Sequence, residues 1–131
     1  MDKNFNEEKA RKIIKEEAKK IKKTNVKELV KREKEIENLI KGLLKRYRED
    51  IKILLSLLKD FISGKYRKVP WFTIAAITTS LIYILNPFDA IPDFIPVIGQ
   101  TDDAIIISVC LKLIEKDIER YKNWKNSKGR A

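Results

Sequence analysis

Hydrophobic residues recur every three or four positions over most of this 131-residue chain, which is the spacing of an amphipathic α-helix. Residues 1–23 carry a thin apolar stripe among many charges, so we expect a polar helix there that frays when isolated. A second helix is predicted over 26–63, since apolar positions repeat throughout this range and Gly64 follows as a stop signal. Asn25, with Glu28 three residues later, resembles a capping box at its start. The stripe of the first helix consists of Ala10, Ile13, Ile14, Ala18 and Ile21.

The middle of the chain is much more apolar than either end. Residues 69–88 contain no charged side chain, and Pro70 suits the first turn of a helix that Asn86-Pro87 would end. A helix over 70–85 would measure about 24 Å, whereas the hydrocarbon layer of a bilayer is roughly 30 Å thick. The segment is therefore a marginal transmembrane helix.

A last helix is predicted to begin near Asp102 and Asp103, whose carboxylates suit the positive end of a helix dipole. Its first part, 104–111, is apolar on every side, and from Lys112 onwards it becomes amphipathic. Consecutive elements usually lie side by side in a fold. We therefore expect the two apolar segments to pack as an antiparallel hairpin.

The connection between these two segments is rich in proline and aspartate. Its spacing of prolines, aspartates and glycine resembles the signature of the YkvA-like family, a bacterial domain of unknown function numbered 1232. The resemblance extends from Trp71 to Leu111. It implies a small, membrane-associated helical domain and brings no known reaction with it. The motif positions are Pro87, Asp89, Pro92, Asp93, Pro96, Gly99, Asp102 and Asp103.

Physical chemistry gives these positions a structural role first. Three prolines prevent a regular helix, while the carboxylates accept freed backbone N–H groups as caps and turn formers. The alternative is that Asp89, Asp93, Asp102 and Asp103 converge and bind Mg²⁺ or Ca²⁺, ions that prefer oxygen ligands. Because the spacing does not match an EF-hand, we favour the structural role and expect no cofactor.

Charge is distributed unevenly along the chain. Of 29 Lys and Arg and 19 Asp and Glu, residues 1–68 carry 22 basic and 12 acidic side chains, and residues 69–111 carry no basic and four acidic ones. Basic segments thus flank the apolar hairpin, and the positive-inside rule places both its ends on the cytoplasmic side of a membrane. An aromatic belt at the membrane surface is then expected from Tyr66, Trp71, Tyr121 and Trp124.

The residue inventory argues against catalysis. The chain has no His, which excludes imidazole bases and ligands, and its single thiol, Cys110, falls within an apolar segment where it is expected to be inert. Basic runs such as Lys45-Arg46 could neutralise nucleic-acid phosphates. Acidic residues are mixed through the same helices, however, so solvated helix faces are the better interpretation.

Together these features predict an all-α protein of about four helices, in which a long amphipathic helix accompanies an apolar hairpin with a proline-rich acidic turn. We divide it into a charged helix over 1–24, a long basic helix over 25–64, the YkvA-like hairpin over 65–124 and a disordered basic tail over 125–131.

The expected role is a non-catalytic, membrane-associated scaffold or interaction domain on the cytoplasmic face, because the N-terminus lacks the apolar core of a secretory signal. Its partners would be an anionic membrane surface, a second copy of the chain or another protein. The alternative is a soluble, cytoplasmic and oligomeric bundle with helix 70–85 at its centre. A metal-binding or nucleic-acid-binding module is less favoured.

Overall fold

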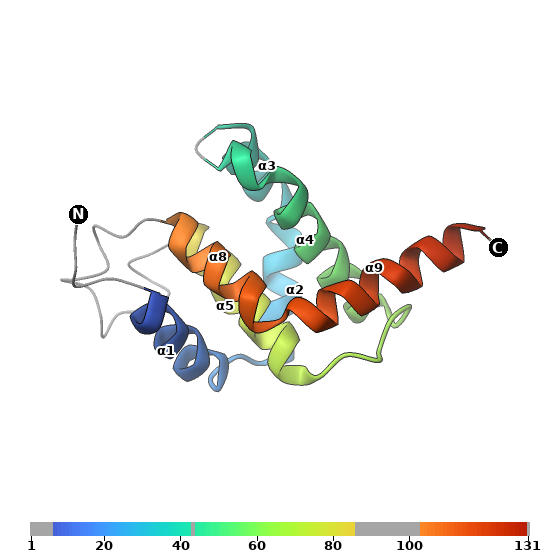
Figure 1. Cartoon of the computed structure of the whole chain (residues 1–131), viewed down its shortest axis with the longest axis horizontal. Coiled ribbons are helices and arrows are strands. Elements are labelled where there is room, and N and C mark those ends of the chain that lie inside the picture. The colour runs from blue at the N-terminus through green and yellow to red at the C-terminus, as the bar shows by residue number, and fades with distance from the viewer. Residues whose placement is uncertain (1–6, 43, 86–102, 131) are drawn as a thin grey trace.

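A computed structural model describes residues 7–42, 44–85 and 103–130, and this part of the chain is all-α, as predicted. It contains seven α-helices rather than about four, together with one 3₁₀ turn (Figure 1). The elements are α1 (Glu7–Ala18), α2 (Lys23–Lys31), α3 (Glu33–Lys41), η1 (Lys45–Tyr47), α4 (Arg48–Ser63), α5 (Trp71–Leu85), α8 (Asp103–Leu113) and α9 (Glu115–Arg130).

Helix α5 is the centre of the fold. Its side chains from Thr73 to Leu81 are buried without interruption, and the helix contacts α1, α2, α3, α4 and α8. Two of its four buried Thr and Ser residues bond back to the helix itself, Thr73 donates to Asp117 of α9, and the Thr79 hydroxyl has no hydrogen-bond partner among the described residues. Thr78 Oγ1 donates to the Ile74 carbonyl at 2.8 Å, and Ser80 Oγ donates to the Ala76 carbonyl at 2.9 Å.

Helices α5 and α8 pack side by side and run in opposite directions (Figure 1). The Cys110 thiol of α8 lies 3.8 Å from the Ala76 carbonyl of α5, so the two helices touch closely near their middle. Ile106, Ile107 and Val109 of α8 are buried in the same core. The predicted antiparallel hairpin is therefore confirmed.

Helix α1 belongs to the core of the protein. Ala10, Ile13, Ile14 and Ala18 are each at most 4% exposed, and α1 contacts both α5 and α8. The thin apolar stripe thus matches a narrow strip of the hairpin surface. We expected this segment to fray in isolation, and in the folded protein tertiary contact supplies the stability that a helix this short lacks.

The prediction of a single long helix over 26–63 is wrong. The backbone leaves helical geometry at Arg32 (φ −96°, ψ 24°) and at Gly42 (φ −114°, ψ −108°), which separates α2, α3 and α4. A straight helix of this length would reach about 57 Å, against about 22 Å for α5. Only a folded path lets the apolar seam of all three helices contact α5. The seam residues Leu29, Ile36, Ile40, Ile51, Leu54 and Leu58 are all buried.

The start of α2 and the extent of the last two helices also differ from the sequence prediction. Helix α2 begins at Lys23, and the Asn25 side chain accepts a 2.7 Å hydrogen bond from the Lys22 backbone N–H. Asn25 therefore caps the helix from inside its first turn, and not from the position before it. The last predicted helix is divided at Ile114, and α9 continues as a helix to Arg130 where we predicted a disordered tail.

None of the described helices is both long enough and apolar enough to span a bilayer. The transmembrane helix that the segment 70–85 suggested is accordingly not found in this part of the chain.

The placement of α1 in the core can be tested by replacing Ile14 with Ala. Ile14 is fully buried between helices, so we expect the substitution to lower the free energy of unfolding by about 2–4 kcal/mol in urea denaturation followed by circular dichroism. The exposed neighbour Lys15 provides the control, and Lys15→Ala should change the stability by less than about 0.5 kcal/mol. Equal stability of Ile14→Ala and wild type would show that α1 does not pack as described.

Candidate functional site

The motif between the two apolar helices lies almost entirely outside the described residues. Asp103 begins α8, but its side chain is not described. The other motif positions lie within residues 86–102, outside the described part of the chain: Pro87, Asp89, Pro92, Asp93, Pro96, Gly99 and Asp102. The predicted convergence of the four carboxylates, and any metal that they would bind, therefore stays a prediction. Within the described ranges no group of three or more His, Cys, Asp or Glu side chains could hold a metal ion.

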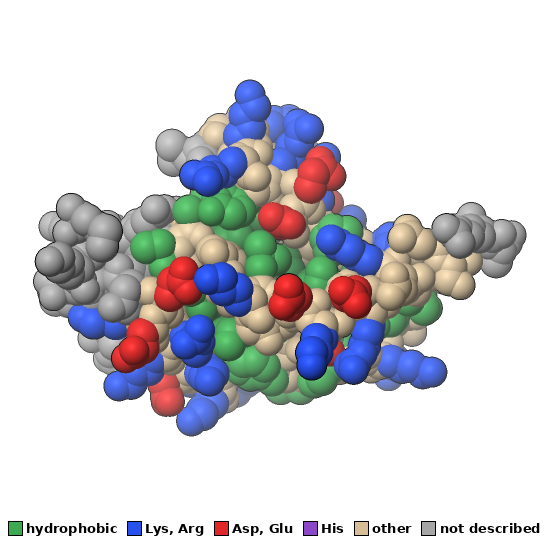
Figure 2. Space-filling model, viewed as in Figure 1, with side chains coloured by type: hydrophobic (Ala, Val, Ile, Leu, Met, Phe, Trp, Pro, Cys, Tyr) green, Lys and Arg blue, Asp and Glu red, His purple; other side chains and the backbone are tan. Residues whose placement is uncertain are grey.

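At the other end of the hairpin, where α5 begins, two large apolar side chains reach the surface. Trp71 is 41% exposed and Phe72 is 40% exposed. Lys65, Arg67 and Lys68, in the loop that leads into α5, are exposed beside them in the sequence. We call these five residues the basic aromatic patch. On the face shown in Figure 2, hydrophobic side chains reach the surface along the lower edge, among Lys and Arg side chains.

The loop that carries this patch is held by a left-handed turn and a buried tyrosine. Gly64 ends α4 with φ 85°, a conformation that glycine adopts without a steric penalty. Tyr66 then turns inward and is only 6% exposed, while the basic residues on either side of it face outward. Trp71 contacts Phe61 of α4, whose tilted ring has its centroid 6.1 Å away. The backbone that carries the patch is therefore held in place by contacts with the rest of the protein.

The predicted aromatic belt does not exist as such. Tyr66 and Tyr121 are buried, and Trp124 packs against both of them with ring centroids 4.8 and 5.8 Å away. These three rings join α9 to the loop before α5, because stacked and edge-on aromatic contacts stabilise a buried interface. Of the four expected belt residues only Trp71 is exposed, and Phe72, which we did not single out, accompanies it.

A polar network fastens α9 to α4 next to these rings. The Tyr121 hydroxyl donates to Asp60 Oδ2 at 2.6 Å and is also hydrogen-bonded to the Ser56 hydroxyl. Lys125 Nζ donates to Ser56 Oγ at 2.7 Å and lies 3.2 Å from Asp60 Oδ2. Four side chains from two helices thus satisfy one another at the edge of the core.

The charges of this network influence one another. Partial burial would raise the pKa of the Asp60 carboxyl, but hydrogen bonds from Tyr121 and Lys125 and the charges of Lys125 and Lys65 outweigh it and hold that pKa below its usual value. Burial, followed by the hydrogen bond to Asp60, raises the pKa of the Tyr121 phenol. Asp60 therefore stays ionised, and Tyr121 stays a hydrogen-bond donor, at neutral pH.

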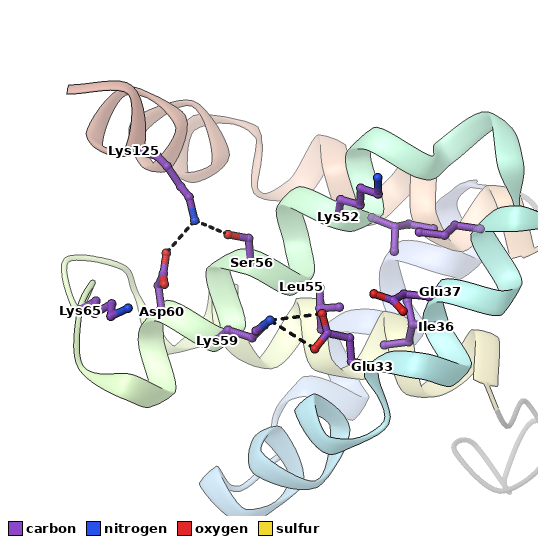
Figure 3. A pocket seen from close by; sticks show the side chains of 12 residues that line it. Glu33, Ile36, Glu37, Lys52, Leu55, Ser56, Lys59, Asp60, Lys65 and Lys125 are labelled. Carbon is purple, nitrogen blue, oxygen red and sulfur yellow. Dashed lines mark hydrogen bonds and ion pairs between the residues drawn. The ribbon is translucent and has the colours of Figure 1, made fainter. Parts of the chain in front are cut away.

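Beside the network a groove of about 480 Å³ lies between α3, α4 and α9 (Figure 3). Lys59 on one wall contacts both carboxylate oxygens of Glu33 on the other at 3.2 Å. Both signs of charge line the groove, so it has no strong preference for an anion or a cation. Its other lining residues are Ile36, Glu37, Ile40, Ile51, Lys52, Leu55, Ser56, Asp60, Lys65 and Lys125.

Cys110 is closed off from solvent and from reagents. It is fully buried between α5 and α8, and this burial raises the pKa of its thiol to about 11. At neutral pH the nucleophilic thiolate form is therefore almost absent. The position agrees with the inert thiol expected from its apolar surroundings in the sequence.

Comparison with known proteins gives two similarities. The sequence model of a family described as "Protein of unknown function (DUF1232)" matches residues 73–109, which run from α5 into α8. The protein named "Uncharacterized membrane protein YkvA" of Bacillus subtilis (strain 168) is 31% identical over an alignment of 90 residues, and this alignment covers 65% of this chain and 85% of the relative. No solved structure is significantly similar to the chain.

The polar network should make the stability depend on pH through Asp60. Its folded-state pKa is lowered, so its contribution is complete above the unfolded-state pKa of about 3.9 and is lost as the pH falls from there through the folded-state value. We expect Asp60→Asn to lower the free energy of unfolding by about 1–3 kcal/mol at pH 7 and by much less at pH 2.

Urea denaturation of wild type and variant at both pH values measures this effect. Glu119→Gln removes an exposed carboxylate from α9 and serves as the control, with no comparable loss expected at pH 7. A difference between wild type and Asp60→Asn that is the same at pH 7 and pH 2 would contradict the role of the ionised carboxylate.

The burial of Cys110 predicts that a thiol reagent such as 5,5′-dithiobis-(2-nitrobenzoic acid) reacts at least about 100-fold more slowly with the folded protein than with the protein in urea, because the thiol is both inaccessible and protonated. One equivalent should react after unfolding, since the chain has one Cys. Rapid labelling of the native protein would show an accessible thiol and reopen a nucleophilic role.

Proposed function

The chain belongs to the YkvA-like family of proteins of unknown function (DUF1232), and from this premise we propose that it is a non-catalytic helical domain that associates with the surface of an anionic membrane. Its contacts with the membrane are made by exterior side chains. The role is that of a membrane-associated interaction or scaffold domain, on the cytoplasmic face.

The observation that carries this proposal is the contrast between a closed apolar centre and a cationic exterior. The sides of α5 are covered by other helices, so they do not face lipid in this fold. The chain has a net charge of +10, and the lysines of α1 and α9, among them Lys12, Lys15, Lys116 and Lys122, are exposed. Basic side chains near an anionic leaflet each contribute roughly 1 kcal/mol of attraction.

Two further points support the proposal. A relative of the chain carries the name of a membrane protein, which makes a membrane a reasonable partner for this domain as well. The absence of His from the sequence, together with the sealed Cys110, removes two of the most common nucleophile systems and favours a binding role over catalysis.

Cell fractionation tests the proposal. We expect the protein to sediment with membranes at low salt and to be released by 1 M NaCl or by carbonate at pH 11, because screening and loss of Lys charge both weaken electrostatic attachment. Retention after both washes would indicate integral insertion. Recovery of the protein in the supernatant at low salt, from cells with intact anionic lipids, would contradict membrane association.

A further inference from the structure

We propose that the basic aromatic patch is the face by which the domain docks on an anionic bilayer. Trp71 and Phe72 enter the headgroup region, and Lys65, Arg67 and Lys68 lie against lipid phosphates. This inference rests on the proposed function and adds the part of the surface, the lipid charge and the orientation of α5, whose first turn meets the bilayer.

Burial restricts where an apolar contact with lipid can be made. From Thr73 to Leu81 every side chain of α5 is already covered by protein, so the length of the helix is closed to lipid. Trp71 and Phe72, in the first turn, are the large hydrophobic side chains that are exposed among the described residues. A bilayer that approaches the apolar part of the molecule therefore meets it at the beginning of α5.

The two aromatic residues suit the membrane interface. Trp and Phe are side chains with which interfacial helices and peripheral proteins bury apolar area at the boundary between headgroups and acyl chains. The Trp71 ring contacts the tilted ring of Phe61 and is 41% exposed, so part of it packs on the protein and part is open to solvent. Its insertion consequently costs less side-chain entropy than that of a freely rotating residue.

The loop that leads into the pair carries charge complementary to anionic lipid, and the carboxylate of Asp117, which Thr73 of the same turn hydrogen-bonds, is paired with Arg120. From Phe61 to Leu85 the chain has three basic residues and no acidic one, and all three are in the loop before Trp71. Lys65, Arg67 and Lys68 are exposed, and none of them forms an ion pair within the described part of the chain. The charges of Arg67 and Lys68 are available to phosphates on the same short segment as the aromatic pair. Lys65, at the edge of the patch, also lines the groove beside Asp60, so part of its charge acts on that carboxylate.

The tertiary structure also sets the orientation of these side chains. The inward-facing Tyr66, packed on Tyr121 and Trp124, anchors the middle of the loop, so Lys65 and Arg67 are held at the surface on either side of it. Lysines of α3 and η1, at the opposite end of the molecule in Figure 1, lack an exposed aromatic neighbour of this kind. We therefore expect membrane binding to depend on where the basic residues lie, and not only on the net charge of the chain.

The direct experiment uses the full chain with Trp124→Phe, which leaves Trp71 as its one tryptophan. Vesicles of phosphatidylglycerol and phosphatidylcholine in equal amounts are titrated in, with pure phosphatidylcholine as the neutral comparison. We expect the emission of Trp71 to shift to shorter wavelength with the anionic vesicles only, since the ring leaves water for the interface. An unchanged emission spectrum while the protein cosediments with the vesicles would overturn the inference.

Two variants separate the patch from overall charge in a sedimentation assay with the same vesicles. We expect Trp71→Ser with Phe72→Ser to lower the partition coefficient at least tenfold, and the triple change of Lys65, Arg67 and Lys68 to Gln to do the same. The matched control changes Lys34, Lys41 and Lys45 to Gln, which removes the same charge from exposed positions on α3 and η1, and should lower it less than threefold. Circular dichroism and urea denaturation verify that each variant is folded.

Each outcome decides between the two proposals. Equal losses in the patch and control triples would show that membrane binding follows net charge alone, which overturns this inference and leaves the proposed function standing. Failure of the wild-type chain to bind anionic vesicles would overturn both. If sedimentation equilibrium shows that the wild-type chain self-associates and the double Ser variant does not, the patch is an interface between copies, and the inference is overturned in favour of that partner.

Discussion

The need to cover α5 on all sides is the constraint on which the rest of the structure depends. A helix without a charged residue has no side that prefers water, and burying its apolar side chains provides most of the driving force for folding. Five other helices pack apolar side chains against it, and α9 adds a hydrogen bond between Asp117 and Thr73. Because these helices are individually short or weakly apolar, most of their stability comes from this shared contact.

This arrangement separates apolar from charged residues and so determines what the surface can do. Aliphatic side chains of α1, α2, α4 and α8 are buried in the core. The exterior therefore consists largely of Lys, Arg and Glu, with few large apolar side chains. The beginning of α5 is an exception because the helices that wrap its sides leave its first two residues partly uncovered. Trp71 and Phe72 stay exposed there as a consequence of where α5 begins.

Helix α9 is attached by different physics from the other helices. Its sequence is strongly polar, so burial alone would hold it weakly, and the interface instead combines three aromatic rings with a network of charged and hydroxyl groups. Such a network stabilises the folded state when every donor and acceptor in it is hydrogen-bonded, and removal of one member lowers the free energy of unfolding. The same contacts fix Tyr66 and thereby the basic loop, so the attachment of α9 and the shape of the basic aromatic patch are linked.

The sequence by itself determined the helical class, the apolar hairpin of α5 and α8, and the family, because these follow from local periodicity, from absence of charge and from a long spaced motif. It also placed Trp71 near a basic flank. Tertiary structure alone decided that 26–63 folds into α2, α3 and α4, that α1 joins the core, and that Tyr66, Tyr121 and Trp124 turn inward. Periodicity specifies which residues share a face of a helix, but which partner covers that face, and which aromatic rings remain for the surface, depends on contacts between residues far apart in the chain.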